Sequence, residues 1–283
     1  MPITSWGWVD PRTIAGLVLA AALLVVFVRR QATVANPLMP LRLFSSRNVV
    51  GANTVQALLV AGMFGMFFLG ALYLQKVLHY SALEVGLAFL PTTVVMGGLS
   101  LGFSEKLIMR FGARNTLIPG FILVTIALLL FARTPVDGNY LTDLLPPFLL
   151  IGIGIGTSFP GIMIMAMSGA TPQDAGLASG LVNTSMQVGG AVGLAVLATL
   201  STERTENLEA AGHATAEALN SGYHLAYLVG AGLAFASVLI AIFVMRPVPA
   251  PAHGPGDGEP TGGSVDAERA VVEDEPVSSA PGI

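Results

Sequence analysis

The sequence contains no cysteine and few charged residues, and each shortage excludes a class of protein. Without cysteine there can be no disulfide bond and no thiolate ligand for a metal. Only 11% of the 283 residues are charged, whereas a soluble domain carries about 25%, so a water-facing surface is excluded. The four histidines are dispersed and belong to no metal-binding or nucleophile motif, which argues against an enzyme. No basic cluster indicates a nucleic-acid partner.

In place of charge, the chain has long uncharged runs. A helix of about 20 apolar residues crosses a bilayer core about 30 Å thick. The runs are residues 13–28, 48–75, 85–104, 115–132, 144–173, 175–202 and 219–245. The first is short, but arginines at both of its ends can extend their charged groups to the membrane interfaces. The sequence therefore predicts an all-α membrane protein of about seven transmembrane helices.

Lysine and arginine are divided unequally between the two alternating sets of loops. In membrane proteins the excess of these residues marks the cytoplasmic side. One set holds Arg29, Arg30, Arg42, Arg47, Lys106, Arg110, Arg114 and Arg246, and the other holds Arg12, Lys76, Arg133 and Arg204. We therefore expect a plasma (inner) membrane protein with its C-terminus in the cytoplasm and the N-terminus of this chain outside. An outside N-terminus without a signal peptide is a poor start for insertion, so we expect a membrane segment upstream.

Composition divides the chain into three parts. Residues 1–47 hold the first helix and a cytoplasmic linker, and residues 48–246 hold a six-helix bundle. Residues 247–283 are rich in proline, glycine and acidic residues, and we expect them to be disordered because they cannot bury enough apolar surface. Within the bundle, residues 203–221 form the longest expected outside loop, with a short interfacial helix at residues 208–219.

The most specific motif is the sequence GFSEKLIMRFGAR, from Gly102 to Arg114, between the third and fourth runs. It predicts a tight cytoplasmic helix–loop–helix turn over residues 105–114. Gly112 permits the turn, and Arg110 and Arg114 can cap helix C-terminal carbonyl groups or pair with Glu105. A general excess of positive charge on the cytoplasmic side is the simpler explanation of the arginines, but the spacing of glycine and basic residues between two spans favours a motif.

This stretch resembles the cytoplasmic loop motif of the major facilitator superfamily, which joins the second and third helices of a six-helix half. The surrounding sequence is more similar to the fourteen-span drug:proton antiporter branch of that family. The similar stretches are NPLMPLRLF (residues 36–44), MFFLGALYLQKVLHYSALEVGLAFLP (residues 66–91) and GLASGLVNTSMQVGGAVGLAVLATL (residues 176–200). The resemblance covers about residues 6–246 and implies that this chain is the C-terminal half, with spans eight to fourteen.

The resemblance carries further expectations. It implies that residues 48–132 and 144–245 form inverted repeats of three helices each. It also implies proton-driven transport of small molecules without a cofactor. The family's first-helix acid, its fourth-helix arginine and its Gly-Pro-rich antiporter motif all belong to the N-terminal half, which would be a partner of this chain. In the loop motif, Ser104 and Glu105 stand near the place of an acid that the family usually carries earlier.

Neutral polar residues within the spans are the candidates for contact with a substrate, because ionisable residues there are almost absent. An amide in hydrocarbon must find a hydrogen-bond partner, so it faces another helix or an aqueous cavity. Asn53 and Gln56 are three residues apart, and we expect them to share a helix face. Asn183 and Gln187, four apart, should do the same. The predicted cavity wall comprises Asn53, Gln56, Asn183 and Gln187, with the apolar Met63, Met66 and Phe67.

Glycines are clustered in the fifth and sixth spans. The stretch GIGIGT at residues 152–157 superficially resembles a dinucleotide fingerprint, but Thr157 stands where the last glycine would be and no strand precedes it. Closely spaced glycines let membrane helices approach one another. We therefore predict that these glycines serve helix packing.

Two functions of different kinds agree with these patterns. One is the C-terminal part of a proton-coupled exporter of drugs or other amphipathic small molecules, incomplete without its N-terminal half. The two halves would rock around a cavity at the midplane of the membrane, with residues 105–114 latching one conformation. The other is a membrane scaffold without transport, a degenerate remnant of a transporter. An upstream segment of six or seven spans with an acidic residue in its first helix would favour the exporter.

Overall fold

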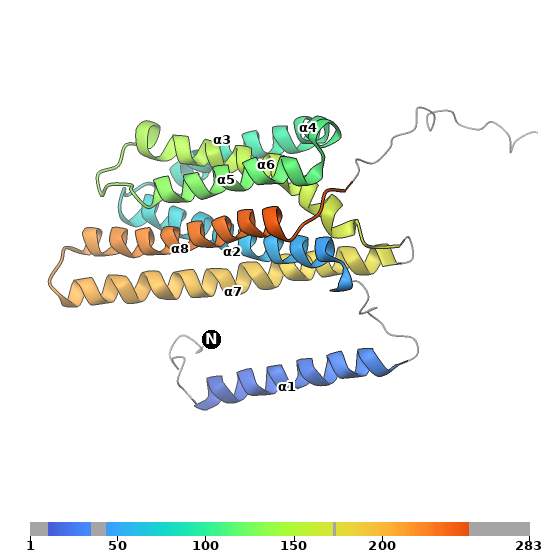
Figure 1. Ribbon diagram of the computed structural model, residues 1–283. Coiled ribbons are helices and arrows are strands. Elements are labelled where there is room, and N and C mark those ends of the chain that lie inside the picture. Colours follow the sequence, from blue (N-terminus) through green and yellow to red (C-terminus); the bar gives the residue numbers. More distant parts are fainter. Residues whose placement is uncertain (1–10, 35–43, 172–173, 249–283) are drawn as a thin grey trace, which may run out of the picture. The chain divides into compact units, whose positions relative to one another are not determined.

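The computed structural model describes residues 11–34, 44–171 and 174–248, and within them the regular structure is entirely helical (Figure 1). The helices are α1 (Pro11–Thr33), α2 (Arg47–Lys76), α3 (Ala82–Gly98), η3 (Leu99–Phe103), α4 (Ser104–Phe111), α5 (Ala113–Phe131), η4 (Tyr140–Leu144), α6 (Leu145–Met167), α7 (Ala175–Ala210) and α8 (Thr215–Phe243). Here η marks a π-helical segment. Because α3, η3 and α4 run on as one segment, and η4 and α6 as another, seven segments of the described residues are long and apolar enough to cross a membrane. The prediction of seven spans is confirmed.

Three expectations fall on residues that the structure does not describe. The cytoplasmic linker and most of the NPLMPLRLF stretch fall on residues 35–43. All but the first two residues of the expected disordered tail, 247–283, also lie outside the described residues.

Helices α2 to α8 pack as two groups of three. In one group α2, α7 and α8 contact one another extensively, and Figure 1 shows them running side by side. In the other, α6 packs against both α3 and α5, while α3 and α5 make few contacts with each other. The contacts of α5 with α8 and of α2 with α6 join the groups.

The two groups are related by an exchange of helices. In the two sequence repeats, α2 corresponds to α6, α3 to α7 and α5 to α8. The α2–α7 contact of one group therefore corresponds to the α6–α3 contact of the other. In the same way, the α2–α8 contact corresponds to the α6–α5 contact. Each group therefore contains helices from both sequence repeats. This interleaving agrees with the predicted architecture of three plus three helices.

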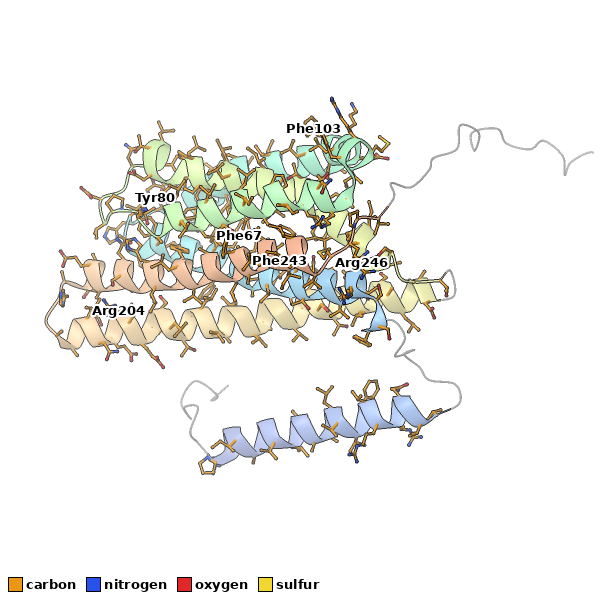
Figure 2. The ribbon with its side chains drawn as sticks, in the orientation of Figure 1. Phe67, Tyr80, Phe103, Arg204, Phe243 and Arg246 are labelled. Carbon is orange, nitrogen blue, oxygen red and sulfur yellow. The ribbon has the colours of Figure 1, made fainter. Side chains whose placement is uncertain are left out.

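Two apolar cores fill the bundle. One is rich in aromatic residues, with the ring of Phe148 5.0 Å from both Phe89 and Phe131. The other contains Phe121 and Met165, which are fully buried. Figure 2 shows Tyr80 and Arg204 at one end of the bundle, Arg246 at the other, and Phe67 between them. The cavity described below lies at this intermediate depth.

Several helix boundaries differ from the prediction. The expected loop at residues 105–114 is mostly helix α4, and the chain turns only at Gly112. The expected outside loop at residues 203–221 is also wrong, because α7 continues to Ala210 and α8 begins at Thr215. The predicted interfacial helix at residues 208–219 is therefore divided between α7 and α8. Charged residues limit where hydrocarbon can surround a helix, but they do not end the helix itself.

Candidate functional site

A cavity of ≈ 480 Å³ lies between α2, α3, α5 and α6, with Met186 of α7 also on its wall. Its volume is within the range of small-molecule sites, about 300–1,000 Å³. From α2 it is lined by Gln56, Met63 and Phe67, three of the residues predicted for the cavity wall. From α6 it is lined by residues that include Phe159. The walls are almost wholly apolar, and none of the lining residues carries a charge.

Glycines of α6 allow the neighbouring helices to approach closely around this cavity. Gly152 and Gly156 face α3, while Gly154 faces α5. A Cβ added at Gly156 would lie 2.7 Å from the carbonyl oxygen of Met96. A Cβ added at Gly154 would lie 2.6 Å from the carbonyl oxygen of Gly120. Since real Cβ atoms do not approach carbonyl oxygens this closely, the helices reach these positions only because the residues are glycine. The predicted packing role is confirmed for these three glycines, whereas nothing described lies within 4 Å of a Cβ added at Gly176 or Gly180 of α7.

Hydrogen bonds from hydroxyl groups hold α3 and α4 against α6. Thr92 Oγ1 donates to the carbonyl oxygen of Phe148 at 3.1 Å, and Ser104 Oγ donates to that of Thr157 at 2.8 Å. Both hydroxyl residues are fully buried. Between these two bonds lies the π-helical segment η3, whose Ser100 lines the cavity. Interruptions of this kind in an α-helix are frequent at functional sites.

Gln56 is the most unusual residue of the cavity. Its side chain is 2% exposed, and its amide nitrogen has no hydrogen-bond partner among the described residues. Leaving a buried amide unpaired costs about 1–3 kcal/mol. The hydroxyl of Ser158, also on the wall, already donates to the carbonyl oxygen of Leu117. Gln56 therefore leaves a buried hydrogen-bond donor unpaired beside the cavity.

A second, more open pocket of ≈ 660 Å³ lies along α2, α7 and α8 and contains Asn53. Here the amide is satisfied. Ser185 Oγ donates to Asn53 Oδ1 at 3.0 Å, and Asn53 Nδ2 donates to the carbonyl oxygen of Val49 at 2.8 Å. The expectation that Asn53 and Gln56 share one wall is wrong. Residues three apart differ by about 60° around a helix, and the boundary between the two pockets falls within that angle.

The remaining predicted wall residues lie elsewhere. Met66 is 1% exposed and belongs to the aromatic-rich core. Asn183 and Gln187 share a helix face as predicted, but both are exposed on α7 and line neither pocket. Asn183 Nδ2 donates to the carbonyl oxygen of Ser179 at 3.2 Å. Their contact with a substrate stays a prediction.

The exposed face of α7 that carries these amides is lined by small and polar residues. At helical spacing it presents Gly176, Gly180, Asn183, Thr184, Gln187 and Ala191, all of them exposed. Large apolar residues such as Val188 and Val192 lie to one side and line the second pocket. A face of small residues is typical of contact with another helix.

Some lining residues were missed from the sequence. Met96, Phe159 and Met186 line the first cavity. A search for polar residues inside spans cannot find apolar ones. A signal was nevertheless present, because Phe159 lies three residues after Gly156 of the α6 glycine cluster and Met186 directly precedes Gln187.

The loop motif forms the turn that its sequence predicted. Gly112 has φ 82°, a conformation that favours glycine. Arg114 donates from Nε to the carbonyl oxygen of Ala241 at 2.9 Å and from Nη2 to that of Ile242 at 2.6 Å. It therefore caps the C-terminal end of α8, as expected of a cation at that position.

The other members of the motif contribute less to this contact. Arg110 lies over the ring of Phe111, at 5.3 Å from its centroid. Gly102 is in η3, and Glu105 is in the first turn of α4. A latching role for the motif stays a prediction.

Comparisons with known proteins agree with this fold. The family sequence model of the Major Facilitator Superfamily matches residues 3–194 of this chain. The chain belongs to this superfamily. It is thus a multi-pass membrane protein of a transporter family rather than an enzyme, as the sequence predicted.

The chain is also similar to individual members of this superfamily. The chain is 34% identical to the puromycin resistance protein pur8 of Streptomyces alboniger over 245 residues, covering 83% of this chain and 48% of that protein. It is 35% identical to the cephamycin export protein CmcT of Amycolatopsis lactamdurans over 235 residues, 83% of this chain and 46% of that protein. For the tetracenomycin C resistance and export protein of Streptomyces glaucescens the identity is 33% over 201 residues, covering 71% and 37%. The chain spans about half or less of the length of these relatives.

Proposed function

We propose that this chain forms the C-terminal part of an exporter of drugs or other amphipathic small molecules. The observation that carries the proposal is the apolar cavity of ≈ 480 Å³ with one buried amide on its wall. Apolar walls with few polar groups suit molecules that partition into membranes. The names of the relatives, which describe resistance to antibiotics or their export, support the same class of substrate.

The exporter would be completed by an N-terminal half. The exposed face of α7 with Asn183 and Gln187 is the surface on which that half would pack. The two halves would then enclose a path at the depth of the cavity and alternate in access to the two sides of the membrane. In this arrangement the capping of α8 by Arg114 would stabilise one of the conformations.

Export would be driven by a proton gradient, with the proton carrier in the N-terminal half. No residue that lines the cavity in the described part of the chain is ionisable. Glu84 is engaged as a helix cap, since the backbone nitrogen of Ser81 donates to its carboxylate at 2.8 Å. The excess of basic residues on one set of loops supports a cytoplasmic C-terminus and an N-terminus of this chain that lies outside.

The test is export of puromycin by bacteria that lack their own efflux pumps. Expression of the complete reading frame should raise the puromycin concentration that stops growth, and a protonophore should abolish the accompanying efflux. Residues 1–283 expressed alone should give no resistance. Export by residues 1–283 alone would contradict the need for a second half. Failure of the complete frame to export puromycin or other amphipathic drugs would favour the scaffold.

A further inference from the structure

We propose that the end of the bundle that carries Arg246 holds a site for the phosphate group of an anionic phospholipid. The site is a pocket of ≈ 320 Å³ that shares no lining residue with the two apolar pockets on α2. It is lined by Ser45, Ser46, Arg47, Asn48 and Arg246. This inference goes beyond the proposed function and does not depend on it, because lipid binding can be measured without transport.

The first argument is that the fold brings two arginines to one place. Arg47 begins α2, and Arg246 follows the end of α8. The backbone nitrogen of Arg246 donates to Asn48 Oδ1 at 2.7 Å, although these residues are 198 positions apart in the sequence. Since Asn48 directly follows Arg47, this bond holds the backbones of both arginines beside the same pocket. The two positive charges are therefore gathered by tertiary structure.

The second argument is the state of the two guanidinium groups. Neither Arg47 nor Arg246 uses its side chain in an ion pair or hydrogen bond with a described residue, and both are exposed. Arg114, in contrast, uses its guanidinium to cap α8. None of the described residues that line the pocket is acidic. A guanidinium group binds phosphate through two parallel N–H···O bonds. The pocket therefore presents charge and donors that suit a phosphate.

The third argument is the position of the pocket at the boundary of the membrane-spanning segments. The second candidate span begins at Arg47, and the last one ends at Phe243. Large apolar side chains next to the pocket in the sequence are exposed, with Phe44 at 42% and Phe243 at 76%. Basic pockets between transmembrane helices bind the head groups of anionic lipids. A phospholipid matches both features, because its phosphate meets the arginines and its acyl chains meet the apolar side chains.

The test is binding of dioleoyl phosphatidylglycerol to the full chain in detergent, measured by native mass spectrometry. Dioleoyl phosphatidylcholine has the same acyl chains and a phosphodiester, but its choline cation repels the arginines. It should bind about tenfold more weakly. Equal binding of the two lipids would overturn the proposal.

Two pairs of substitutions locate the site. Arg47→Gln with Arg246→Gln should weaken the binding of phosphatidylglycerol about 30-fold, which corresponds to about 1 kcal/mol for each arginine. The matched control is Lys106→Gln with Arg110→Gln on α4, at the same end of the bundle (Figures 1 and 2). Both control residues are exposed and line none of the described pockets. An equal loss in the two pairs would show a general effect of surface charge and would overturn the proposal.

A melting curve gives a second readout. Because Arg47 and Arg246 are exposed, their replacement should leave the melting temperature without lipid unchanged. Phosphatidylglycerol should raise the melting temperature of the unchanged chain and of the control pair, because it binds the folded state. The same rise in the pocket pair would place the lipid elsewhere and overturn the proposal.

Two further measurements separate the lipid from other anions. Glycerol 3-phosphate, a soluble phosphate without acyl chains, should not displace phosphatidylglycerol, and displacement would overturn the assignment to a lipid. The acidic segment at the C-terminus is the other rival, since residues 249–283 carry seven acidic residues. Removing this segment should leave the affinity for phosphatidylglycerol within about threefold. A larger gain that depends on Arg47 and Arg246 would show that the segment fills the pocket, which would overturn the proposal.

Discussion

Two pockets lie on the two faces of α2. Both are lined mostly by apolar residues, but they differ in whether the amide side chain of α2 beside them is fully hydrogen-bonded. The face toward α7 and α8 has an amide, Asn53, bound to Ser185. The face toward α3, α5 and α6 has an amide, Gln56, whose nitrogen is unpaired. Polarity at membrane depth therefore has two meanings within one helix. It joins helices where the hydrogen bond is formed, and it leaves a buried donor unpaired where the bond is not formed.

The largest expected effect on stability comes from forcing α3 and α6 apart beside the pocket that contains Gln56. Gly156→Val would drive a side chain into the backbone of Met96, which cannot move aside. We expect a loss of about 3 kcal/mol in the free energy of unfolding, measured by denaturation in detergent. Gly98→Val is the matched control, since nothing lies within 4 Å of a Cβ there, and it should change stability by less than about 0.5 kcal/mol. Equal effects of the two substitutions would contradict the close α3–α6 contact.

A smaller effect is expected at the closed amide. Asn53→Ala should lower the free energy of unfolding by about 1 kcal/mol, because it breaks the bond between α2 and α7. A double-mutant cycle with Ser185→Ala should show a coupling energy of about 0.6 kcal/mol, as is typical between membrane helices. Purely additive effects would remove the contrast with Gln56, because Asn53 would then not depend on its partner.

The smallest effect on stability is expected on the exposed face of α7. Gln187→Ala should change the free energy of unfolding by less than about 0.5 kcal/mol, since the side chain is exposed. It should nevertheless reduce puromycin export by the complete reading frame, if this face meets the N-terminal half. Val188→Ala, its neighbour on the second pocket, is the control and should export normally. Unchanged export in Gln187→Ala would remove α7 from the transport path.

Much of the fold could be predicted because a helix that crosses hydrocarbon needs a long run of uncharged, mostly apolar residues. The seven spans follow from the uncharged runs, and the close approach of α6 to its neighbours follows from Gly152, Gly154 and Gly156. The ends of α4 and α7 could not be predicted in this way. A helix continues through Glu203 and Arg204 into water once its backbone is already hydrogen-bonded.

The site was only partly predictable for a geometric reason. Gln56, Met63 and Phe67 were expected to line a cavity and do so. Asn53 lies only about 60° away around the helix, and Met66 is next to Phe67 in sequence, yet one faces the other pocket and one faces the core. Sequence spacing gives the angle between two residues. It does not give the place where a neighbouring helix divides one environment from the next.

The interleaving of the two helix groups also sets an order of assembly. On the ribosome α2 is made first of the six bundle helices, and two of its main partners, α7 and α8, are made last. At roughly 5–20 residues per second, α2 waits on the order of ten seconds for its neighbours. During that time the hydrogen bond between Ser185 and Asn53 cannot yet form. The joining of α2 to α7 is therefore a late step in the making of the bundle.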